Sequence, residues 1–342
     1  MTQNVLTVII PMYNMERYID QCLSSLLCGE EAEALEVLVV NDGSTDDSPR
    51  IAHAYEARHP NVFRVIDKPN GHYGSCVNRA LAEATGKYVK VLDADDYYER
   101  DNLGPFLSFL RANDLDMVFT PFTEVKEDGS LRKRLRYRFL PGHTYALSAL
   151  TSRVHMCMHS VTYRTDLLRS IHYRQSEGMA YTDQEWIFLP MAAVERWQFW
   201  PHVIYHYRVG REGQSVAASS YVRSMQQEND GLLTMVRLYE ERKGALSPES
   251  CRYLESRLVA RAKFVYKAYL LHFYHAGLCD QLQDLRALDE QLASLSPHVH
   301  HLLDGLSFHI GPYPFRFVRH WRKSGFDPNL WGLRLKRRKK RA

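Results

Sequence analysis

The sequence predicts an α/β fold with a doubly wound, mostly parallel sheet, followed by a helical C-terminal module. In the first third of the 342 residues, short apolar runs alternate with amphipathic segments, which is the order of a βαβ sheet. Polar loops rich in Asp, Asn and Gly follow these runs, at the sheet edge where such folds bind ligands. After about residue 216 the apolar spacing is helical over long stretches.

Five apolar runs have the length and composition of strands that are buried on both faces. They lie at Val5–Ile10, Leu35–Asn41, Val62–Ile66, Tyr88–Leu92 and Leu115–Phe119. The segments between them place apolar residues three and four apart, as amphipathic helices do. These predicted helices lie at Glu16–Leu27, Asp46–Arg58, Ser75–Ala84 and Asn102–Ala112.

The region after Phe119 is less regular and predicts a mixture of elements. A hairpin is expected around Asp128-Gly129, and HMCMHSVTYRTDLLRS is typical of a strand that enters a short helix. TDQEWIFLPMAAV has a helical apolar face, and FWPHVIYHYRV alternates like a single strand. Long helices should follow at Tyr221–Lys243, Pro248–His275 and Asp280–Leu295.

The composition is that of a globular protein, with 45% hydrophobic and 25% charged residues. No apolar run approaches the roughly 18 residues that cross a bilayer, and no secretory signal precedes the first strand. The 6 cysteines are scattered, which favours reduced thiols over a disulfide framework or a zinc site. We therefore expect a cytoplasmic protein.

The stretch VLDADDYY ends a predicted buried strand with three carboxylates, Asp93, Asp95 and Asp96. Like charges this close to one another disfavour ionisation, and a divalent cation removes that cost. Mg²⁺ or Mn²⁺, held by one or two carboxylates and a substrate phosphate, fits such an Asp-x-Asp loop. The alternative is that one Asp caps the next helix while the others are solvated.

The loop NDGSTDDS after the second predicted strand contains a further acidic residue, Asp42. Ser44 to Asp47 are well placed to cap the next helix and to add negative charge to its first turn. Asp42 lies inside the turn instead, where its carboxylate can accept the N–H of a uracil-like base.

Four segments of the chain resemble the family-2 glycosyltransferases of GT-A fold. They are VIIPMYNMERYIDQCLSSLL, LEVLVVNDGSTDDS, KPNGHYGSCVNRALAEATGKYVKVLDADD and YTDQEW, and the likeness covers roughly residues 5–210. Each motif alone is weak, but the four together, in the family's order and spacing, are specific. GHYGSCVNRA and YHYRVGREGQSV are most similar to a bacterial branch that is often found in cell-surface polysaccharide loci.

The resemblance implies a nucleotide-sugar site at the strand ends and a metal ion held by Asp93 and Asp95. Asp95 would be the direct metal ligand, Asp93 would lie nearer the ribose and sugar, and Asp96 would support them or cap the next helix. Many members have Arg where this chain has Val77, so the basic group that meets the donor stays open. The residues assigned to the nucleotide-sugar site are Pro11, Tyr13, Asn14, Glu16, Asp42, Lys68, Asn70, Gly71, Asn78, Asp93, Ala94 and Asp95.

Asp183 in YTDQEW is the candidate catalytic base, because the equivalent motif of the family places its catalytic Asp there. A carboxylate opposite the leaving group takes the proton of the acceptor hydroxyl, and direct displacement inverts the anomeric centre. The alternative is that Thr182 or Asp183 only caps a helix. Glu185 is the second candidate base.

Two further groups of polar residues have alternative interpretations. His155 and His159 have the i, i+4 spacing of metal ligands, but we expect a partly buried structural pair. Residues of YHYRVGREGQS either line the diphosphate side of the site or are solvated, and they are His206, Arg208, Arg211 and Gln214.

The expected organisation is a catalytic GT-A domain over residues 1–215, a helical module over 216–310 and a basic, aromatic tail over 311–342. The tail combines Phe, Trp and Leu with dense Arg and Lys, as attachment to an anionic membrane surface requires. Through this tail the protein would lie peripherally on the inner face of the cytoplasmic membrane. A disordered, solvated tail is the alternative, and nucleic acid is not expected because no binding motif accompanies the charge.

The sequence thus predicts an inverting glycosyltransferase that depends on Mg²⁺ or Mn²⁺. It would move a sugar from a nucleoside-diphosphate sugar, preferably a UDP-sugar, to a hydroxyl of a glycan or lipid-linked acceptor in cell-surface polysaccharide synthesis. The alternative is a non-catalytic sugar-nucleotide binding or scaffold protein. A sugar nucleotidyltransferase fits less well, because PMYN after the first strand supplies no glycine-rich basic loop.

Overall fold

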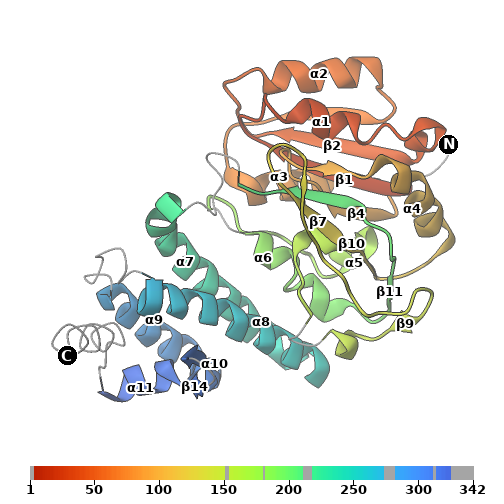
Figure 1. The fold of residues 1–342 in the computed structure, drawn as a ribbon. Coiled ribbons are helices and arrows are strands. Elements are labelled where there is room, and N and C mark those ends of the chain that lie inside the picture. The colour runs from red at the N-terminus through yellow and green to blue at the C-terminus, as the bar shows by residue number, and fades with distance from the viewer. Residues whose placement is uncertain are drawn as a thin grey trace. The chain divides into compact units, whose positions relative to one another are not determined.

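A computed structural model describes residues 4–150, 154–179, 182–210, 218–272, 282–310 and 313–324 of the chain (Figure 1). The chain divides into two compact units, Met1–Tyr221 and Val222–Ala342. The sequence predicts this boundary after residue 215, whereas the observed boundary lies within helix α7 (Ala218–Arg242).

The first unit is built on an eight-stranded sheet in the order β3-β2-β1-β4-β10-β6-β11-β9. Strands β1 to β4 are parallel to one another, whereas β10 runs antiparallel between β4 and β6. The predicted mixed α/β fold around a large sheet is thereby confirmed. The strands are β1 (Leu6–Met12), β2 (Leu35–Asn41), β3 (Phe63–Asp67), β4 (Tyr88–Val91), β6 (Met117–Phe119), β9 (Thr144–Tyr145), β10 (Val161–Arg164) and β11 (Trp197–Phe199).

Helices cover both faces of this sheet. Val8 and Ile10 of β1 pack in one core with apolar residues of α1, α2 and α4. Helix α3 also packs on β1 and β2, but its buried Val77 and Ala80 do not belong to that core, so it covers the other face. The helices of this unit are α1 (Ile19–Ser24), α2 (Ser48–Arg58), α3 (His72–Glu83), α4 (Arg100–Ala112), α5 (Thr165–Ser170) and α6 (Asp183–Trp186).

Two segments of the middle region differ from the prediction. FWPHVIYHYRV is not one strand. Its first residue, Phe199, ends β11 of the large sheet, and Tyr205–Arg208 form β12 of a different sheet, because Pro201 cannot donate a hydrogen bond to a strand ladder. TDQEWIFLPMAAV contains only the one-turn helix α6 and a 3-10 turn at Pro190–Ala193, since Pro190 interrupts helical hydrogen bonding.

A second sheet of four strands, in the order β5-β12-β7-β8, contains the predicted hairpin. Gly129 turns the chain between β7 and β8 with a φ of 78°, in the left-handed region that glycine tolerates. Strand β12 pairs with both β5 and β7, so it brings its side chains to the loop that follows β4. The strands are β5 (Tyr97–Tyr98), β7 (Phe122–Val125), β8 (Leu131–Arg134) and β12.

The second unit is mainly helical, as the sequence predicts. Helix α11 is joined to α9 by Arg322, whose Nε donates to Asp289 Oδ1 at 3.0 Å. Residues 325–342, the larger part of the predicted tail, lie outside the described residues. Within the described chain, every helix is too short or too polar to span a bilayer. The remaining elements are α7, α8 (Pro248–Lys267), α9 (Leu282–Leu295), α10 (Pro297–Leu302), β13 (Phe308–Ile310), β14 (Tyr313–Phe315) and α11 (Phe317–Ser324).

Candidate active site

The carboxyl ends of β1, β2 and β3 meet at one edge of the large sheet. Asp42 donates its backbone N–H to the Met12 carbonyl at 2.8 Å, and Lys68 donates its N–H to the Asn41 carbonyl at 3.0 Å. Strand β4 is parallel to β1, so the loop that follows it opens at the same edge. The four polar loops therefore converge where ligands bind in sheets of this kind.

Asp42 is the centre of the first part of the site and is almost completely buried. Its Oδ1 accepts hydrogen bonds from the Lys68 ammonium and from the Gly71 N–H, the latter at 2.9 Å. Lys68 also donates to Ser75 Oγ at 2.8 Å, near the start of α3. Three residues that the sequence assigns to the nucleotide, Asp42, Lys68 and Gly71, are thus in direct contact.

Asn14 and Glu16 support the loop that follows Asp42. Asn14 Oδ1 accepts the Thr45 N–H at 2.8 Å, and Glu16 Oε2 accepts the Asp47 N–H at 3.0 Å. Tyr13 beside them is 47% exposed, which leaves its ring open to a stacking ligand. A direct contact of Asn14 or Glu16 with a nucleotide stays a prediction.

The loop after β4 places Asp93 and Asp96 beside two tyrosines. Tyr73 Oη, from α3, donates to Asp93 Oδ1 at 2.7 Å. Tyr205 Oη, from β12, donates to Asp96 Oδ2 at 2.6 Å and accepts the Asp93 N–H at 3.1 Å. Asp96 Oδ1 accepts the Arg208 N–H at 2.7 Å, so both oxygens of this buried carboxylate are held.

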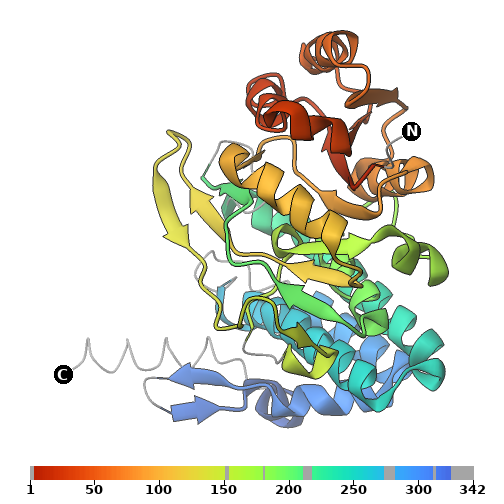
Figure 2. The ribbon, with the colours of Figure 1, turned by 90° about the vertical axis from the view of Figure 1, so that its right-hand side faces the viewer.

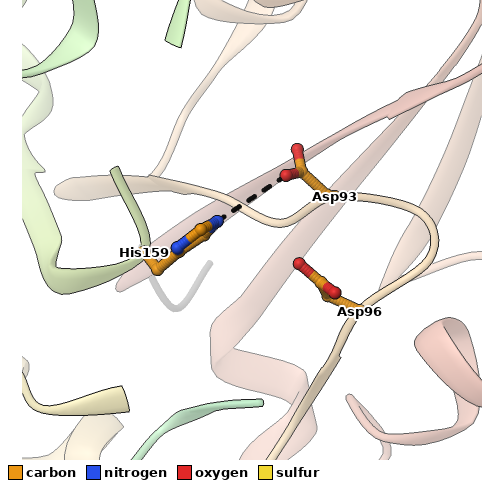
Figure 3. Close-up of side chains that lie close together, drawn as sticks. All are labelled: Asp93, Asp96 and His159. Carbon is orange, nitrogen blue, oxygen red and sulfur yellow. Dashed lines mark ion pairs between the residues drawn. The ribbon is translucent and has the colours of Figure 1, made fainter. Parts of the chain in front are cut away.

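His159 completes a group of three potential metal ligands with Asp93 and Asp96, as Figure 3 shows. One ligand atom from each residue lies within 4.8 Å of the others, and His159 Nε2 is 3.8 Å from Asp93 Oδ2. His159 Nδ1 is buried and has no hydrogen-bond partner among the residues that the structure describes. Two carboxylates and an imidazole fit a divalent ion, whose charge would also offset their repulsion.

The ionisation of these groups reflects burial and crowded charge. Burial raises the pKa of Asp96 well above its ordinary value, and Asp95 and Asp93 raise it further. Burial opposes the charge on His159, but Cys157 and Asp93 raise its pKa to about 10. In turn, His159 lowers the pKa of Cys157 to about 6 in spite of burial. The group therefore favours an added positive charge, whether a proton or a metal ion.

Lys90 of β4 is fully buried and holds the backbone around His159. Its Nζ donates to the His159 carbonyl at 2.7 Å and to the Val161 carbonyl at 3.1 Å. Burial lowers the pKa of Lys90 to about 7. Because β10 pairs with β4, this contact fixes His159 next to the loop that carries Asp93.

Asp95, the predicted direct metal ligand, is not a member of this group of three. The residue is buried, and its carbonyl accepts a hydrogen bond from Arg208 Nε at 3.0 Å. Asp96, for which the sequence predicts a supporting or capping role, is a member instead. It does not cap the next helix, because Glu99 is the N-cap residue of α4. The metal role of Asp95 stays a prediction.

Asp183 begins α6 and is partly exposed. Thr182 occupies the N-cap position, but its side chain makes no capping hydrogen bond. Burial is the main cause of the raised pKa of Tyr73 and of Tyr207, and Asp183 is one of the charges that add to it. The helix α6 that carries Asp183 packs against the turn Met158–Ser160, which carries His159.

Glu185, the second candidate base, is buried and already engaged. Its Oε2 accepts the Ser176 N–H at 2.8 Å, and burial raises its pKa. Ser176 belongs to a segment that lies across α3. Glu185 thus has a supporting role in the described structure.

Asn78, predicted to lie near the ribose and diphosphate, holds this same segment. Its Nδ2 donates to the Gln175 carbonyl at 2.8 Å, and its Oδ1 accepts the Gln175 N–H at 2.8 Å. Gly74 permits the close approach, because a Cβ at this position would lie 1.9 Å from the Ser176 carbonyl oxygen. The nucleotide contact of Asn78 stays a prediction.

The other predicted residues lie at the same edge of the sheet. Pro11 is part of β1, and Ala94 is buried in the loop after β4. Asn70 Oδ1 accepts the His72 N–H at 3.3 Å, at the turn into α3. A groove of about 630 Å³ continues from Lys68 and Ser75 along α3.

The sequence patterns did not point to Tyr73, Tyr205 and Tyr207, and they favoured a structural pair for His159, which the structure places among the three potential metal ligands. Alternation in YHYR is the signal that could have found two of them, because odd positions share one face of the strand. The Tyr207 ring stacks on His159 with centroids 4.4 Å apart. His206 faces the other way and bonds Thr123 Oγ1 at 2.6 Å, and its place at the diphosphate stays a prediction. Arg211 and Gln214 lie outside the described residues.

The sequence is similar to those of several known proteins. The sequence profile of Glycosyl transferase family 2 matches residues 7–171. A chondroitin synthase of Pasteurella multocida is 38% identical over 128 residues, which are 37% of this chain and 13% of that protein. The uncharacterized glycosyltransferase YibD of Escherichia coli is 32% identical over 192 residues, which are 54% of this chain and 55% of that one.

Two solved structures share the fold. S. aureus TarS, residues 1–349 in complex with UDP-GlcNAc, has a TM-score of 0.64 at 22% identity, over 86% of this chain and 82% of that one. The mannosyltransferase PcManGT of Pyrobaculum calidifontis, in complex with GDP-Man and Mn²⁺, has a TM-score of 0.52 at 16% identity, over 95% and 81%. At these identities the two likenesses show a shared fold. The similarity to glycosyl transferase family 2 is carried by residues 7–171, just under half of the chain.

Proposed function

We propose that this chain is an inverting glycosyltransferase that takes a UDP-sugar and uses Mn²⁺. The observation that carries the proposal is the meeting of Asp93, Asp96 and His159 beside Tyr73, with the helix of Asp183 packed against the turn that carries His159. Sugar transfer needs charge stabilisation at the departing diphosphate and a base at the acceptor hydroxyl. The group of three ligands suits the first task, and Asp183 suits the second.

The ligand set supports Mn²⁺ over Mg²⁺. An imidazole nitrogen is one of the three potential ligands, whereas Mg²⁺ is held mainly by oxygen atoms. Bound there, the ion would act as a Lewis acid toward the negative charge of the departing diphosphate. The PcManGT structure contains Mn²⁺, which supports an ion of this kind in the fold.

Asp183 is the base in this proposal. Its carboxylate takes the proton of the acceptor hydroxyl as the acceptor oxygen bonds to the anomeric carbon. The bond from that carbon to the diphosphate oxygen breaks, and the electron pair leaves with the nucleoside diphosphate. Attack from the face opposite the leaving group inverts the anomeric centre. Glu185 suits this task less well, because it is buried and binds the Ser176 N–H.

The donor nucleotide would occupy the first part of the site. Asp42 is the proposed acceptor for the base N–H, with Tyr13 available to stack on the ring. Lys68, which pairs with Asp42, would offer its positive charge to the diphosphate. UDP is the first nucleotide to test, because TarS structures contain UDP-GlcNAc and UDP.

The proposed acceptor is a hydroxyl of a glycan or of a lipid-linked chain in cell-surface polysaccharide synthesis. A chondroitin synthase among the relatives supports a glycan acceptor. A lipid-linked acceptor would place the reaction at the inner face of the cytoplasmic membrane.

Calorimetry of UDP binding, with and without Mn²⁺, tests the donor site. We expect binding that requires Mn²⁺ and that weakens by at least tenfold in Asp93→Asn and in His159→Gln, whereas the exposed Asp128→Asn serves as a matched control. Asp95→Asn then tests whether the predicted Asp-x-Asp pair also holds the ion. Binding that is absent, or unchanged by both site variants, would refute the metal and donor assignments.

Release of UDP from a panel of UDP-sugars, with and without glycan acceptors, tests catalysis. Accelerated release in the presence of one acceptor supports a transferase. Tight, Mn²⁺-dependent UDP binding without release or transfer for any pair would favour the alternative of a non-catalytic sugar-nucleotide binding protein.

A further inference from the structure

The edge strand β8 and the chain that follows it, residues 131–140, form an exposed basic surface on the first unit. The segment reads LRKRLRYRFL, so half of its residues are Arg or Lys and none is acidic. We propose that this segment, the basic edge, docks on an anionic lipid bilayer. The proposal does not depend on the donor that the enzyme takes.

The second half of the basic edge alternates between inward-facing, buried or half-buried positions and exposed ones. Leu135 is buried, the Tyr137 ring lies 4.6 Å from that of Phe119, and the Phe139 ring lies 4.8 Å from that of Trp197. These inward side chains anchor the segment on the large sheet. The side chains between and beside them are exposed, and they are Arg134, Arg136, Arg138 and Leu140. A row of cations is thus presented from a fixed backbone, which lowers the entropy lost on binding.

The positive charges of the basic edge are mostly unpaired. Arg132 lies 3.5 Å from Glu124. The other four cationic side chains have no carboxylate within 4.0 Å among the residues the structure describes, and they are Lys133, Arg134, Arg136 and Arg138. A surface of anionic headgroups supplies the missing charge, and each cation near it strengthens binding several-fold.

Two leucines distinguish a bilayer from other occupants. Leu131 is 60% exposed and Leu140 is 68% exposed, at opposite ends of the cationic run. Exposed charges on an edge strand can serve only to prevent it from pairing with another chain. Exposed leucines do not fit that role, because they favour association. A soluble polyanion would gain nothing from them either. Insertion of both side chains at the headgroup boundary gives them a function.

The basic edge is connected to the candidate active site through the hairpin. Figure 2 shows the β7–β8 hairpin standing out at one side of the first unit, in yellow. In the turn of this hairpin, the Glu127 carbonyl accepts a hydrogen bond from Arg208 Nη1 at 3.0 Å, and Glu127 Oε1 accepts one from Tyr18 Oη at 2.8 Å. Arg208 also binds the Asp95 carbonyl. Docking would therefore hold the carboxylate loop close to a lipid-linked substrate.

Vesicle sedimentation tests the proposal on the full-length chain. The vesicles are phosphatidylcholine alone, or phosphatidylcholine with 30% phosphatidylglycerol, and inorganic polyphosphate is the soluble polyanion. Because the basic residues at 334–341 could also bind, all variants carry Gln in place of Arg and Lys there. The test variant is Arg134→Gln/Arg136→Gln/Arg138→Gln. The matched control removes three exposed arginines elsewhere, with Arg50→Gln/Arg58→Gln/Arg111→Gln.

We expect binding to the anionic vesicles only, weakened about 100-fold by the test variant and at most threefold by the control. Leu131→Ser/Leu140→Ser should weaken vesicle binding and leave polyphosphate binding unchanged. Equal losses in test and control variants would overturn the proposal. So would a leucine variant that binds vesicles normally, because the surface would then recognise soluble polyanions. UDP calorimetry on the same variants should be unaffected, which separates this proposal from the donor assignment.

Discussion

Tyr205 and Asp96 are joined by a buried hydrogen bond of 2.6 Å between residues 109 positions apart in the chain. The Tyr205 hydroxyl also accepts the Asp93 N–H, so one side chain from the second sheet fixes two residues of the carboxylate loop. The ligand geometry at this loop therefore depends on a strand that follows much later in the sequence.

Tyr205→Phe should lower the free energy of unfolding by about 1–3 kcal/mol, because Asp96 and the Asp93 N–H lose a buried partner. Mn²⁺ affinity should fall as well. Tyr98→Phe is the matched control, since the buried Tyr98 hydroxyl has no hydrogen-bond partner among the described residues. Urea denaturation of both variants gives the comparison, and equal stability of the two would show that the Tyr205 bond contributes nothing.

Asp183→Asn should lower the rate of sugar transfer by about 10²- to 10⁴-fold, because the acceptor proton loses its base. The affinity for UDP and Mn²⁺ should stay unchanged. Glu185→Gln should instead lower stability, since the Ser176 N–H would lose a charged acceptor. Steady-state rates and thermal unfolding of the two variants test whether Asp183 serves catalysis and Glu185 serves stability. A normal rate in Asp183→Asn would exclude it as the base.

Mn²⁺ affinity should rise with pH. The pKa of His159 is raised to about 10, so below this pH the ion must displace a proton from the imidazole. One displaced proton gives an increase of up to about tenfold in affinity per pH unit. Calorimetry between pH 6.5 and 8.5, in buffers of different ionisation enthalpy, measures both the affinity and the proton release. A flat profile would mean that His159 does not ligate the ion.

Lys90 should make stability depend on pH in the alkaline range. Burial lowers its pKa to about 7, below its ordinary value of 10.5, so between these values the unfolded chain holds one more proton there. The free energy of unfolding then rises with pH across this window, by up to about 1.4 kcal/mol per unit.

Lys90→Met removes that contribution, so the stability difference between Lys90→Met and the wild type should change between pH 7.5 and 9.5. Urea denaturation at three pH values measures it. Parallel pH profiles would show that Lys90 titrates as an ordinary lysine.

Gly74→Ala should displace the segment that lies across α3, because the added Cβ would lie 1.9 Å from the Ser176 carbonyl oxygen. Overpacking of this kind costs about 1–3 kcal/mol. Gly244→Ala is the control, since nothing lies within 4 Å of the corresponding Cβ. Thermal unfolding and UDP binding are the measurements. Equal stability of the two variants would mean that the segment moves freely.

The first third of the fold was predictable because its signals are local. The strand runs at 35–41 and 88–92 and the helix at 46–58 follow from apolar periodicity alone, and they fall within a few residues of the observed elements. Their loops carry Asp42 and Asp93, so the edge of the sheet that carries the site followed as well. The division of FWPHVIYHYRV between two sheets was not predictable, because alternation does not specify which sheet a strand joins.

The metal group shows the same limit at the level of single residues. Asp93 and Asp96 lie in one short acidic loop and are neighbours in the sequence, so the sequence alone brings them together. His159 and Tyr205 reach that loop through strand order in two sheets, and no local pattern encodes the order. For this reason the histidine was interpreted as a structural residue, although it faces Asp93.

The antiparallel strand β10 lies between β4 and β6, yet it follows both of them in the chain. As the polypeptide leaves the ribosome, the facing edges of β4 and β6 must stay open until β10 is available. Lys90 and the His159 carbonyl that it binds are separated by 69 positions. The His159 imidazole therefore reaches the site only when this later part of the chain packs beside β4. Synthesis up to the end of β6 thus gives an exposed pair of strand edges, which a nascent chain must shield from neighbouring chains.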